Sequence, residues 1–337
     1  MIQRAPLAQS EVCELQFPSV YTGEMINERS KTLQQAMLQT GYVADKGLLV
    51  SLDLMQTLEK PLLLEGEAGV GKTGIATSLA TATGLPLIRL QCYEGLDAQH
   101  VLYDWDYQRQ LLAIQMLKSS TGAPGSGGNE LPRFKETIYS EEFLLKRPLF
   151  QAISAPERVI LLIDEVDRAD EEFEALLLEV LAESQITVPE LGTFKAATRP
   201  HVILTSNAVR ELSDALRRRC LYHYIDYPDA DKELSIVKAR LPEIDQTLAS
   251  EAVKLIQRLR EQSLRKKPGI AETLDWLAAL CSLDIKQLKD SPEAVDSTLS
   301  ALLKTRADQK MVREELKSGT LLNPQPLDSQ QEIQGDE

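Results

Sequence analysis

A short glycine-rich segment, residues 66–73, has the residue types and spacing that hold a nucleoside triphosphate. It reads GEAGVGKT and fits the pattern GxxxxGK[ST] at every fixed position. Glycine lets backbone amides turn inward around a phosphate, and the start of a following helix adds a partial positive charge. Lys72 is expected to reach the β- and γ-phosphates, and the Thr73 hydroxyl to ligate Mg²⁺. The expected contacts to the nucleotide are Gly66, Glu67, Ala68, Gly69, Val70, Gly71, Lys72, Thr73 and Gly74.

Two more polar groups follow apolar runs further along the chain. Asp164 and Glu165 come after ILLI, and Asn207 comes after HVILTS. An acid at the end of a buried strand faces the crevice where α/β sheets bind ligands. We expect Asp164 to hold Mg²⁺ through water, and Glu165 to orient and deprotonate the attacking water. Asn207 is then placed to bond that water or the γ-phosphate. The plainer alternatives are a solvated acidic pair and a helix cap before Glu211.

The apolar periodicity predicts strands that alternate with helices up to residue 228 and only helices after it. Helices are expected at 30–38, 46–59, 73–83 and 171–182, with a further helical stretch ending near 118. Strands are expected at 61–64, 87–92, 159–163, 201–205 and 221–227, and a hairpin at 185–196. The later helices are expected at 230–241, 247–264, 271–283 and 292–316. This pattern is typical of a three-layer α/β fold with a parallel sheet, followed by a smaller all-helical domain.

These patterns divide the chain into five predicted parts. They are a partly helical extension at 1–39, an α/β nucleotide domain at 40–228, a helical lid at 229–290, a helical extension at 291–319 and a disordered tail at 320–337. Residues 119–132 contain four Gly and two Pro, which predicts a mobile loop. This loop and the hairpin, with Leu191 and Phe194 expected to be exposed, are candidate contacts for a protein partner, or ordinary loops.

Composition excludes several classes of protein. The formal net charge of −14 argues against nucleic acid as the main ligand. No apolar run is long enough to span a bilayer, and the first residues lack the apolar core of a secretory signal. The four cysteines are scattered and only 3 His are present, so neither a zinc site nor a disulfide framework is indicated. We therefore expect a reduced, cytoplasmic protein.

The three strand-end motifs, in this order and spacing, resemble the AAA+ superfamily and, within it, the MoxR family. The stretch at 161–169, LLIDEVDRA, is similar to the extended acidic motif of that family, and the hairpin at 185–196 falls where the family has one. Five stretches resemble the branch linked to maturation of aerobic carbon-monoxide dehydrogenase: GYVADKGL, PLLLEGEAGVGKT, IRLQCYEGLD, DALRRRCLYHYIDYP and LRKKPGIAETLDW. The resemblance covers roughly residues 40–285.

This resemblance implies an ATPase that uses ATP and Mg²⁺, assembles as a hexameric ring and places each ATP between two subunits. One subunit donates an arginine to its neighbour, and Arg219, then Arg218, is favoured over Arg217. Tyr42 and Val43 align with residues that contact adenine. Relatives act as chaperones that remodel or mature protein clients, some of them metalloenzymes, often with a partner that carries a von Willebrand factor A domain.

One position departs from the family pattern. Many members have an arginine at the start of the third lid helix, and the aligned residue here is Glu272. Either one of the upstream basic residues Arg265, Lys266 and Lys267 takes its place, or the lid senses nucleotide in another way.

Two other functions stay open at this stage. The first is an AAA+ ATPase that acts with nucleic acid, such as a restriction or replication accessory, and the second is a monomeric small-molecule kinase. Tyr103, Trp105 and Tyr107 alternate with acids, and we expect them to anchor a helix in the core rather than to stack on a ligand.

Overall fold

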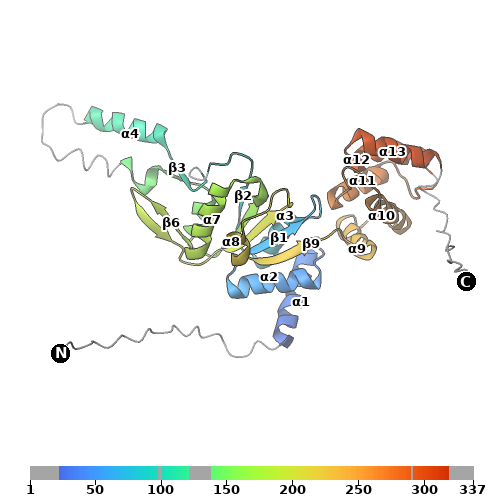
Figure 1. The fold of residues 1–337 in the computed structure, drawn as a ribbon, viewed down its shortest axis with the longest axis horizontal. Coiled ribbons are helices and arrows are strands. Elements are labelled where there is room, and N and C mark those ends of the chain that lie inside the picture. Colours follow the sequence, from blue (N-terminus) through green and yellow to red (C-terminus); the bar gives the residue numbers. More distant parts are fainter. Residues whose placement is uncertain (1–22, 98–100, 121–137, 290, 319–337) are drawn as a thin grey trace, which may run out of the picture.

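A five-stranded sheet, in which every pairing is parallel, forms the centre of the α/β part of the chain (Figure 1). The computed structural model describes residues 23–97, 101–120, 138–289 and 291–318. The strands, in the spatial order of the sheet, are β2 (Leu87–Gln91), β5 (Ile160–Asp164), β8 (His201–Ser206), β1 (Leu62–Gly66) and β9 (Leu221–Ile225). The three inner strands are buried along their whole length, because their apolar side chains have protein on both faces.

Helices cover both faces of this sheet, so the fold has three layers. The strand alternation sends Leu62 and Leu64 to one face, where they pack with helices α1, α2 and α3. Leu63 lies on the opposite face, in the core that includes α6, α7 and α8. These helices are α1 (Gly23–Gln39), α2 (Lys46–Leu58), α3 (Lys72–Thr83), α6 (Pro148–Ile153), α7 (Glu171–Glu183) and α8 (Asp214–Arg219). The predicted fold class is confirmed.

The segment between β2 and β5 contains two short strands that the sequence patterns did not predict. Strand β3 (Tyr103–Trp105) pairs antiparallel with β4 (Leu144–Lys146), and helix α4 (Tyr107–Ser120) starts directly after β3. The helical stretch that was predicted to end near residue 118 therefore begins only at Tyr107, after β3. A 3₁₀ turn, η1 (Glu141–Phe143), leads into β4. Figure 1 shows α4 projecting away from the body of the sheet.

The aromatic residues of this segment divide between core and solvent. Trp105 is 8 % exposed, and its ring meets the Tyr139 ring edge-on at 5.2 Å between centroids. Tyr103 likewise packs edge-on against Phe150. Tyr107, however, is 67 % exposed, so its predicted role as a core anchor is wrong. It belongs to the first turn of α4, and its side chain faces solvent.

The predicted hairpin is confirmed as β6 (Gln185–Val188) paired antiparallel with β7 (Gly192–Lys195). Gly192 has a φ of +93° at the start of β7, a conformation that glycine adopts without strain. Phe194 is only partly exposed, because its ring packs 4.9 Å from the ring of Phe150 in α6. Leu191 packs against the same core. The expectation that both side chains are exposed is therefore wrong.

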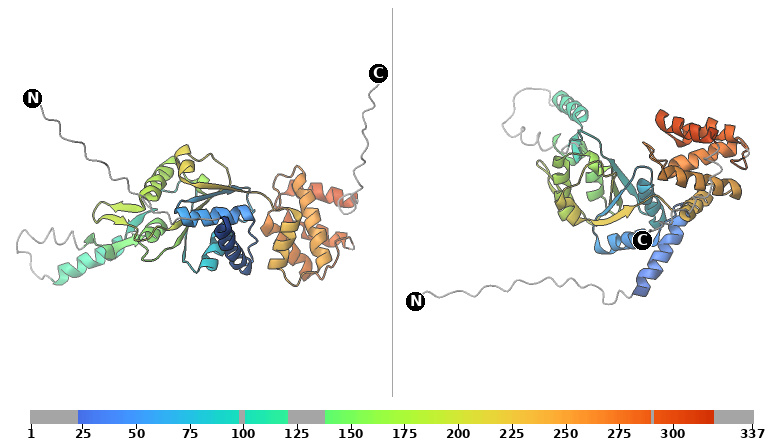
Figure 2. Two further views of the ribbon diagram at one scale, coloured as in Figure 1. Left: turned by 90° about the horizontal axis from the view of Figure 1, so that it is seen from below. Right: turned by 45° about the vertical axis from the view of Figure 1, so that its right-hand side comes forward.

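Five helices with a core of their own follow the sheet (Figure 2). They are α9 (Ala230–Arg240), α10 (Gln246–Glu261), α11 (Ile270–Ser282), α12 (Pro292–Leu302) and α13 (Arg306–Lys317). The single helix predicted at 292–316 is wrong, since the chain leaves the helical conformation at Leu303 and restarts after Thr305. The Thr305 side chain accepts a hydrogen bond from the Asp308 amide, which caps the new helix.

A buried ion pair joins these helices to the linker from the sheet. Arg260 of α10 makes two hydrogen bonds to Glu233 of α9, at 2.8 and 2.7 Å. Its Nε donates to the Pro268 carbonyl, and its guanidinium lies 4.8 Å from the centre of the Tyr227 ring. Glu233 also accepts from Thr273 of α11. One carboxylate and one guanidinium thus fix the orientation of three helices.

Arg260→Met is expected to lower the free energy of unfolding by about 3–5 kcal/mol, since it leaves the Glu233 carboxylate buried without its cation. Urea denaturation followed by circular dichroism measures this. Arg313→Met is the matched control, because the Arg313–Asp296 pair is about half exposed and such pairs contribute roughly 0–1 kcal/mol. Equal losses in the two variants would contradict the importance of the buried pair.

Candidate functional site

The loop between β1 and α3 is built so that its backbone can turn tightly. Gly66 has no room for a side chain, since a Cβ there would lie 2.1 Å from the carbonyl oxygen of Ile225. Gly69 and Gly71 have φ angles of +86° and +93°, in the left-handed region that favours glycine. Helix α3 begins immediately afterwards at Lys72. The sequence therefore folds locally as the phosphate-binding pattern requires.

Lys72 lies inside this loop. Its Nζ donates to the carbonyl oxygens of Gly66 at 2.6 Å and Glu67 at 2.8 Å, and the residue is 7 % exposed. Burial lowers the pKa of Lys72, and the carboxylates of Asp167 and Asp164 oppose that shift. The ammonium is thus held at the centre of the loop, where it faces the acids at the end of β5.

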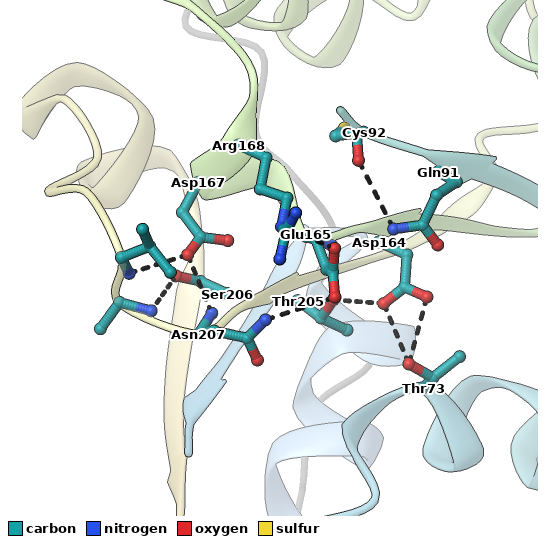
Figure 3. A network of polar contacts seen from close by, with 12 residues as sticks. Thr73, Gln91, Cys92, Asp164, Glu165, Asp167, Arg168, Thr205, Ser206 and Asn207 are labelled. Atoms are coloured by element: carbon teal, nitrogen blue, oxygen red, sulfur yellow. Dashed lines mark hydrogen bonds and ion pairs between the residues drawn. The ribbon is translucent and has the colours of Figure 1, made fainter. Parts of the chain in front are cut away.

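Asp164, at the end of β5, accepts hydrogen bonds from three other elements, and Figure 3 shows two of the donors, Thr73 and Thr205. It accepts from Thr73 Oγ1 at 3.0 and 3.1 Å and from Thr205 Oγ1 at 2.5 Å. It also accepts from Arg89 Nη2 of β2 at 2.6 Å. Sequence reasoning missed Arg89. The register of the two strands brings it there, because Gln91 pairs with Asp164 and Arg89 lies two residues earlier, on the same face of β2.

Thr73 and Asp164 together suit a hard cation. Their oxygens lie 3.0 Å apart, and one carboxylate plus a hydroxyl is the kind of donor set that Mg²⁺ uses alongside phosphate oxygens. Among the described residues, no group of three His, Cys, Asp or Glu side chains could hold a metal by itself. The residues present therefore fit a nucleotide-bound Mg²⁺ and not an independent metal centre.

Glu165 and Asn207 lie beside each other, as the sequence predicted. Asn207 Nδ2 donates to Glu165 Oε1 at 3.4 Å, while Arg168 Nε pairs with Glu165 Oε2 at 2.9 Å. Arg168 belongs to the 3₁₀ turn η2 (Val166–Arg168). The backbone amide of Glu165 donates to Thr205 Oγ1. The Thr205 hydroxyl therefore links the two consecutive acids, a role that sequence reasoning did not assign to it.

Tyr42 and Val43 lie on the wall of a cavity between the α/β domain and the helical lid. The same cavity is lined by Val70, Gly71 and Gly74 of the loop and helix, and by Ile270 and Leu274 of α11. Burial raises the pKa of the Tyr42 phenol. The cavity is mostly apolar and adjoins the phosphate loop, which suits a flat heterocycle. Sequence reasoning missed the two lid residues because nothing in their pattern distinguishes them from ordinary core positions.

The lid also contacts the phosphate loop through backbone atoms. The Ile270 amide donates to the Gly69 carbonyl at 2.9 Å. A Cβ on Gly269 would lie 2.7 Å from that same oxygen, so glycine permits the approach. Glu272 accepts a hydrogen bond from the Gly269 amide at 3.2 Å and so caps its own helix. Arg265 and Lys266 are exposed, and their amides donate to Asp308.

The three arginines of α8 are held differently. Arg217 pairs with Glu65 of β1 at 2.9 Å. Arg218 is 82 % exposed and lies 3.7 Å from Asp214, which is itself exposed. Arg219 is exposed, and its Nη1 lies 3.4 Å from the Ala215 carbonyl oxygen. Arg218 and Arg219 therefore lie outside the group formed by Thr73, Asp164, Glu165 and Asn207.

Gly269→Ala is expected to separate the lid from the phosphate loop. Because a backbone hydrogen bond contributes about 0.5–1.5 kcal/mol, exchange of the Ile270 amide should quicken about 2- to 10-fold. Hydrogen exchange read by mass spectrometry or NMR measures this. Gly84→Ala is the control, since nothing lies within 4 Å of a Cβ added at Gly84, although Gly84 has a positive φ and Gly269 does not. Unchanged exchange at Ile270 in Gly269→Ala would refute the contact.

Comparisons with known proteins agree with this geometry. Residues 61–220 match the family model described as AAA domain (dynein-related subfamily). An uncharacterized protein of Staphylococcus haemolyticus is 25% identical over 285 residues, which cover 82% of this chain and 97% of that protein.

Two solved structures are similar at lower identity. A candidate ATPase from Cytophaga hutchinsonii has 16% identity and a TM-score of 0.41, covering 88% of this chain and 95% of that one. A mutant of RuvB from Thermotoga maritima has 16% identity and a TM-score of 0.44, covering 87% of this chain and 77% of that one. The matched residues 61–220 contain the phosphate loop, both acids, the asparagine and the arginines of α8. The chain has the three-layer α/β fold of a P-loop nucleoside triphosphatase, with a parallel sheet followed by helices.

Proposed function

We propose that this chain is a Mg²⁺-dependent ATPase of the MoxR type that works as a ring of identical subunits and remodels a protein client. One observation carries the ATPase part of the proposal. Lys72, Thr73, Asp164, Glu165 and Asn207 come from three segments distant in the sequence, yet they converge at one edge of the sheet. Each has the chemical type that phosphoryl transfer to water needs.

Hydrolysis follows from these positions. Lys72 and the loop amides would bind the β- and γ-phosphates. Thr73 and Asp164 would hold Mg²⁺, which would neutralise charge on the phosphate oxygens. Water attacks the γ-phosphorus while the bond to the β,γ-bridging oxygen breaks. Glu165 accepts the proton from that water. Each oxygen of Glu165 has one contact, to Asn207 or to Arg168, and a carboxylate oxygen can accept a further hydrogen bond from the attacking water.

A ring of subunits supplies the part that the single chain lacks. Arg218 and Arg219 are exposed and away from Glu165, which suits donation to the site of a neighbouring subunit. A guanidinium placed against the γ-phosphate stabilises charge that develops in the transition state. We retain Arg219 as the first candidate and Arg218 as the second, in a ring of six.

Helix α4 supports a protein as client or partner. Tyr107, Leu111, Leu112 and Met116 are each more than half exposed on this projecting helix. An exposed apolar group of this kind is typical of a surface that contacts another protein.

We extend the proposal to a partner with a von Willebrand factor A domain and to a cytoplasmic location. No helix among the described residues is long and apolar enough to cross a membrane.

ATP turnover per chain is expected to rise steeply as protein concentration increases from nanomolar to tens of micromolar, because complete sites form only between subunits. A phosphate-release assay measures this, and Glu165→Gln should abolish turnover at every concentration while still binding ATP. A flat, appreciable rate would argue against the ring and favour a monomeric kinase-like enzyme. Salt-sensitive DNA binding by the pure protein would instead favour the nucleic-acid alternative.

Arg219→Ala is expected to bind ATP normally and to lower turnover by about 10³- to 10⁵-fold, the range known for such arginines. Mixing it with Glu165→Gln should restore part of the turnover. A site with intact Glu165 on the first variant can then meet an intact Arg219 on the second. If the mixture stays inactive while each variant still assembles and binds ATP, Arg219 is not the donated residue, and Arg218→Ala takes its place in the same mixing experiment.

A further inference from the structure

Asp167 is a buried carboxylate that the hydrolytic scheme above does not use. It lies in η2, two residues after Glu165, and is 2 % exposed. Its Oδ2 accepts hydrogen bonds from the backbone amides of Asn207 at 3.1 Å and Val209 at 2.9 Å (Figure 3). One side chain from the end of β5 thus holds the turn that follows β8.

Two residues beside this carboxylate have a backbone conformation that side chains disfavour. Ala208 has a φ of +56° and Glu165 a φ of +55°, and neither is glycine. Such conformations persist when neighbouring groups over-determine them, and they gather at functional sites. Here the Ala208 amide donates to Ser206 Oγ at 3.0 Å, between the two amides that Asp167 holds. Three consecutive amides of the turn are therefore fixed by side-chain oxygens.

The Asp167 side chain is buried but only partly hydrogen-bonded. Its second oxygen, Oδ1, is buried and has no hydrogen-bond partner among the described residues. No ion pair to Asp167 occurs in that part of the chain, so two amides are its only close donors. A buried charge that is only partly satisfied destabilises the fold, and its presence needs an explanation. Lys72 supplies only a longer-range attraction.

The neighbouring residue has a complementary contact. Arg168 pairs with Glu165 Oε2, so consecutive residues of η2 hold the two side chains that must meet at the attacking water. Arg168 fixes the carboxylate of Glu165, and Asp167 fixes the backbone from which Asn207 projects. The separation between Glu165 and Asn207 therefore depends on this one turn.

We propose that Asp167 is a positioning residue for hydrolysis, which sets the distance from Asn207 to Glu165 by holding the turn at residues 207–209. The expected effect of Asp167 on ATP turnover rests on the proposed ATPase function. Because Asp167 acts through Asn207, its loss reduces turnover and leaves ATP binding intact. The interaction requires an acceptor oxygen, so an amide side chain serves nearly as well as a carboxylate.

The test compares Asp167→Ala, Asp167→Asn and Asn207→Ala, alone and combined. Asp167→Ala is expected to lower kcat by about 10- to 100-fold, no more than the lower limit of the roughly 10²- to 10⁴-fold that a positioned proton transfer contributes, with ATP affinity within about threefold of the parent. Asp167→Asn keeps most of kcat. In the Asn207→Ala background, Asp167→Ala causes no further loss, since residues that act as one unit are not additive.

Asp245→Ala is the matched control. Asp245 also accepts two backbone amides, those of Thr247 and Leu248, but it caps α10 in the lid. This variant is expected to leave kcat unchanged. The positioning role would be overturned if the losses of kcat were additive in the double variant. It would also be overturned if Asp167→Asn lowered kcat as much as Asp167→Ala does.

A second readout does not depend on ATP turnover. Amide exchange at Asn207 and Val209 should quicken about tenfold or more in Asp167→Ala and stay near the parental rate in Asp167→Asn. If the parent chain hydrolyses no ATP, the ATPase proposal fails, and this exchange pattern still decides whether Asp167 holds the turn. Unchanged exchange in a folded Asp167→Ala would remove the inference. If Asp167→Ala does not fold, Asp167→Leu takes its place. Unchanged amide exchange at Asn207 and Val209 in that variant would also remove the inference.

Discussion

The parallel pairing of β5 with its neighbours is the constraint on which the candidate site depends. Gln91 lies opposite Asp164, and Ile163 opposite Leu204, so β2, β5 and β8 end at the same edge of the sheet. Strand β1 pairs with β8 and ends there too, which places the phosphate loop next to Asp164. A shift of one residue would turn Asp164 to the opposite face and move it away from Thr73. Register, set by apolar side chains on both faces, thus determines the chemistry at the strand ends.

The polar groups at this edge are stable only as a connected set. Lys72, Asp164 and Asp167 are each less than a tenth exposed, and each alone would be costly to bury. The Thr205 hydroxyl joins the amide of Glu165 to the carboxylate of Asp164, and Arg89 adds a cation from the outer strand. Removing one member leaves others unsatisfied, so the geometry of the site and the stability of this edge are coupled.

The sequence was sufficient for the parts of the fold that repeat a strong local pattern. Long apolar runs predicted the five strands, and the polar residues that follow these runs predicted the grouping of Lys72, Asp164, Glu165 and Asn207. It did not predict β3 and β4, because strands of three residues carry no measurable alternation. The break between Leu303 and the cap at Thr305 was also missed.

Contacts between segments distant in the sequence could not be predicted, for a different reason. Arg89 and Asp167 have ordinary local surroundings, and their importance appears only when β2, β5 and β8 are brought together. The same holds for Phe194, whose alternating pattern suggested solvent but whose partner, Phe150, lies in another element. The catalytic roles of the candidate residues and the limits of the domains remain predictions.

The helices that follow the sheet contact the phosphate loop through backbone atoms. In place of an arginine, α11 presents Glu272, which caps its own helix, and the backbone of Ile270 bonds directly to Gly69. Arg260 connects the same loop, through Pro268, to Glu233 and the linker at Tyr227. The hydrogen bond to Gly69 and the contact to Arg260 thus leave from neighbouring residues, Ile270 and Pro268. The approach to the phosphate loop and the packing of three helices therefore depend on the same short segment before α11.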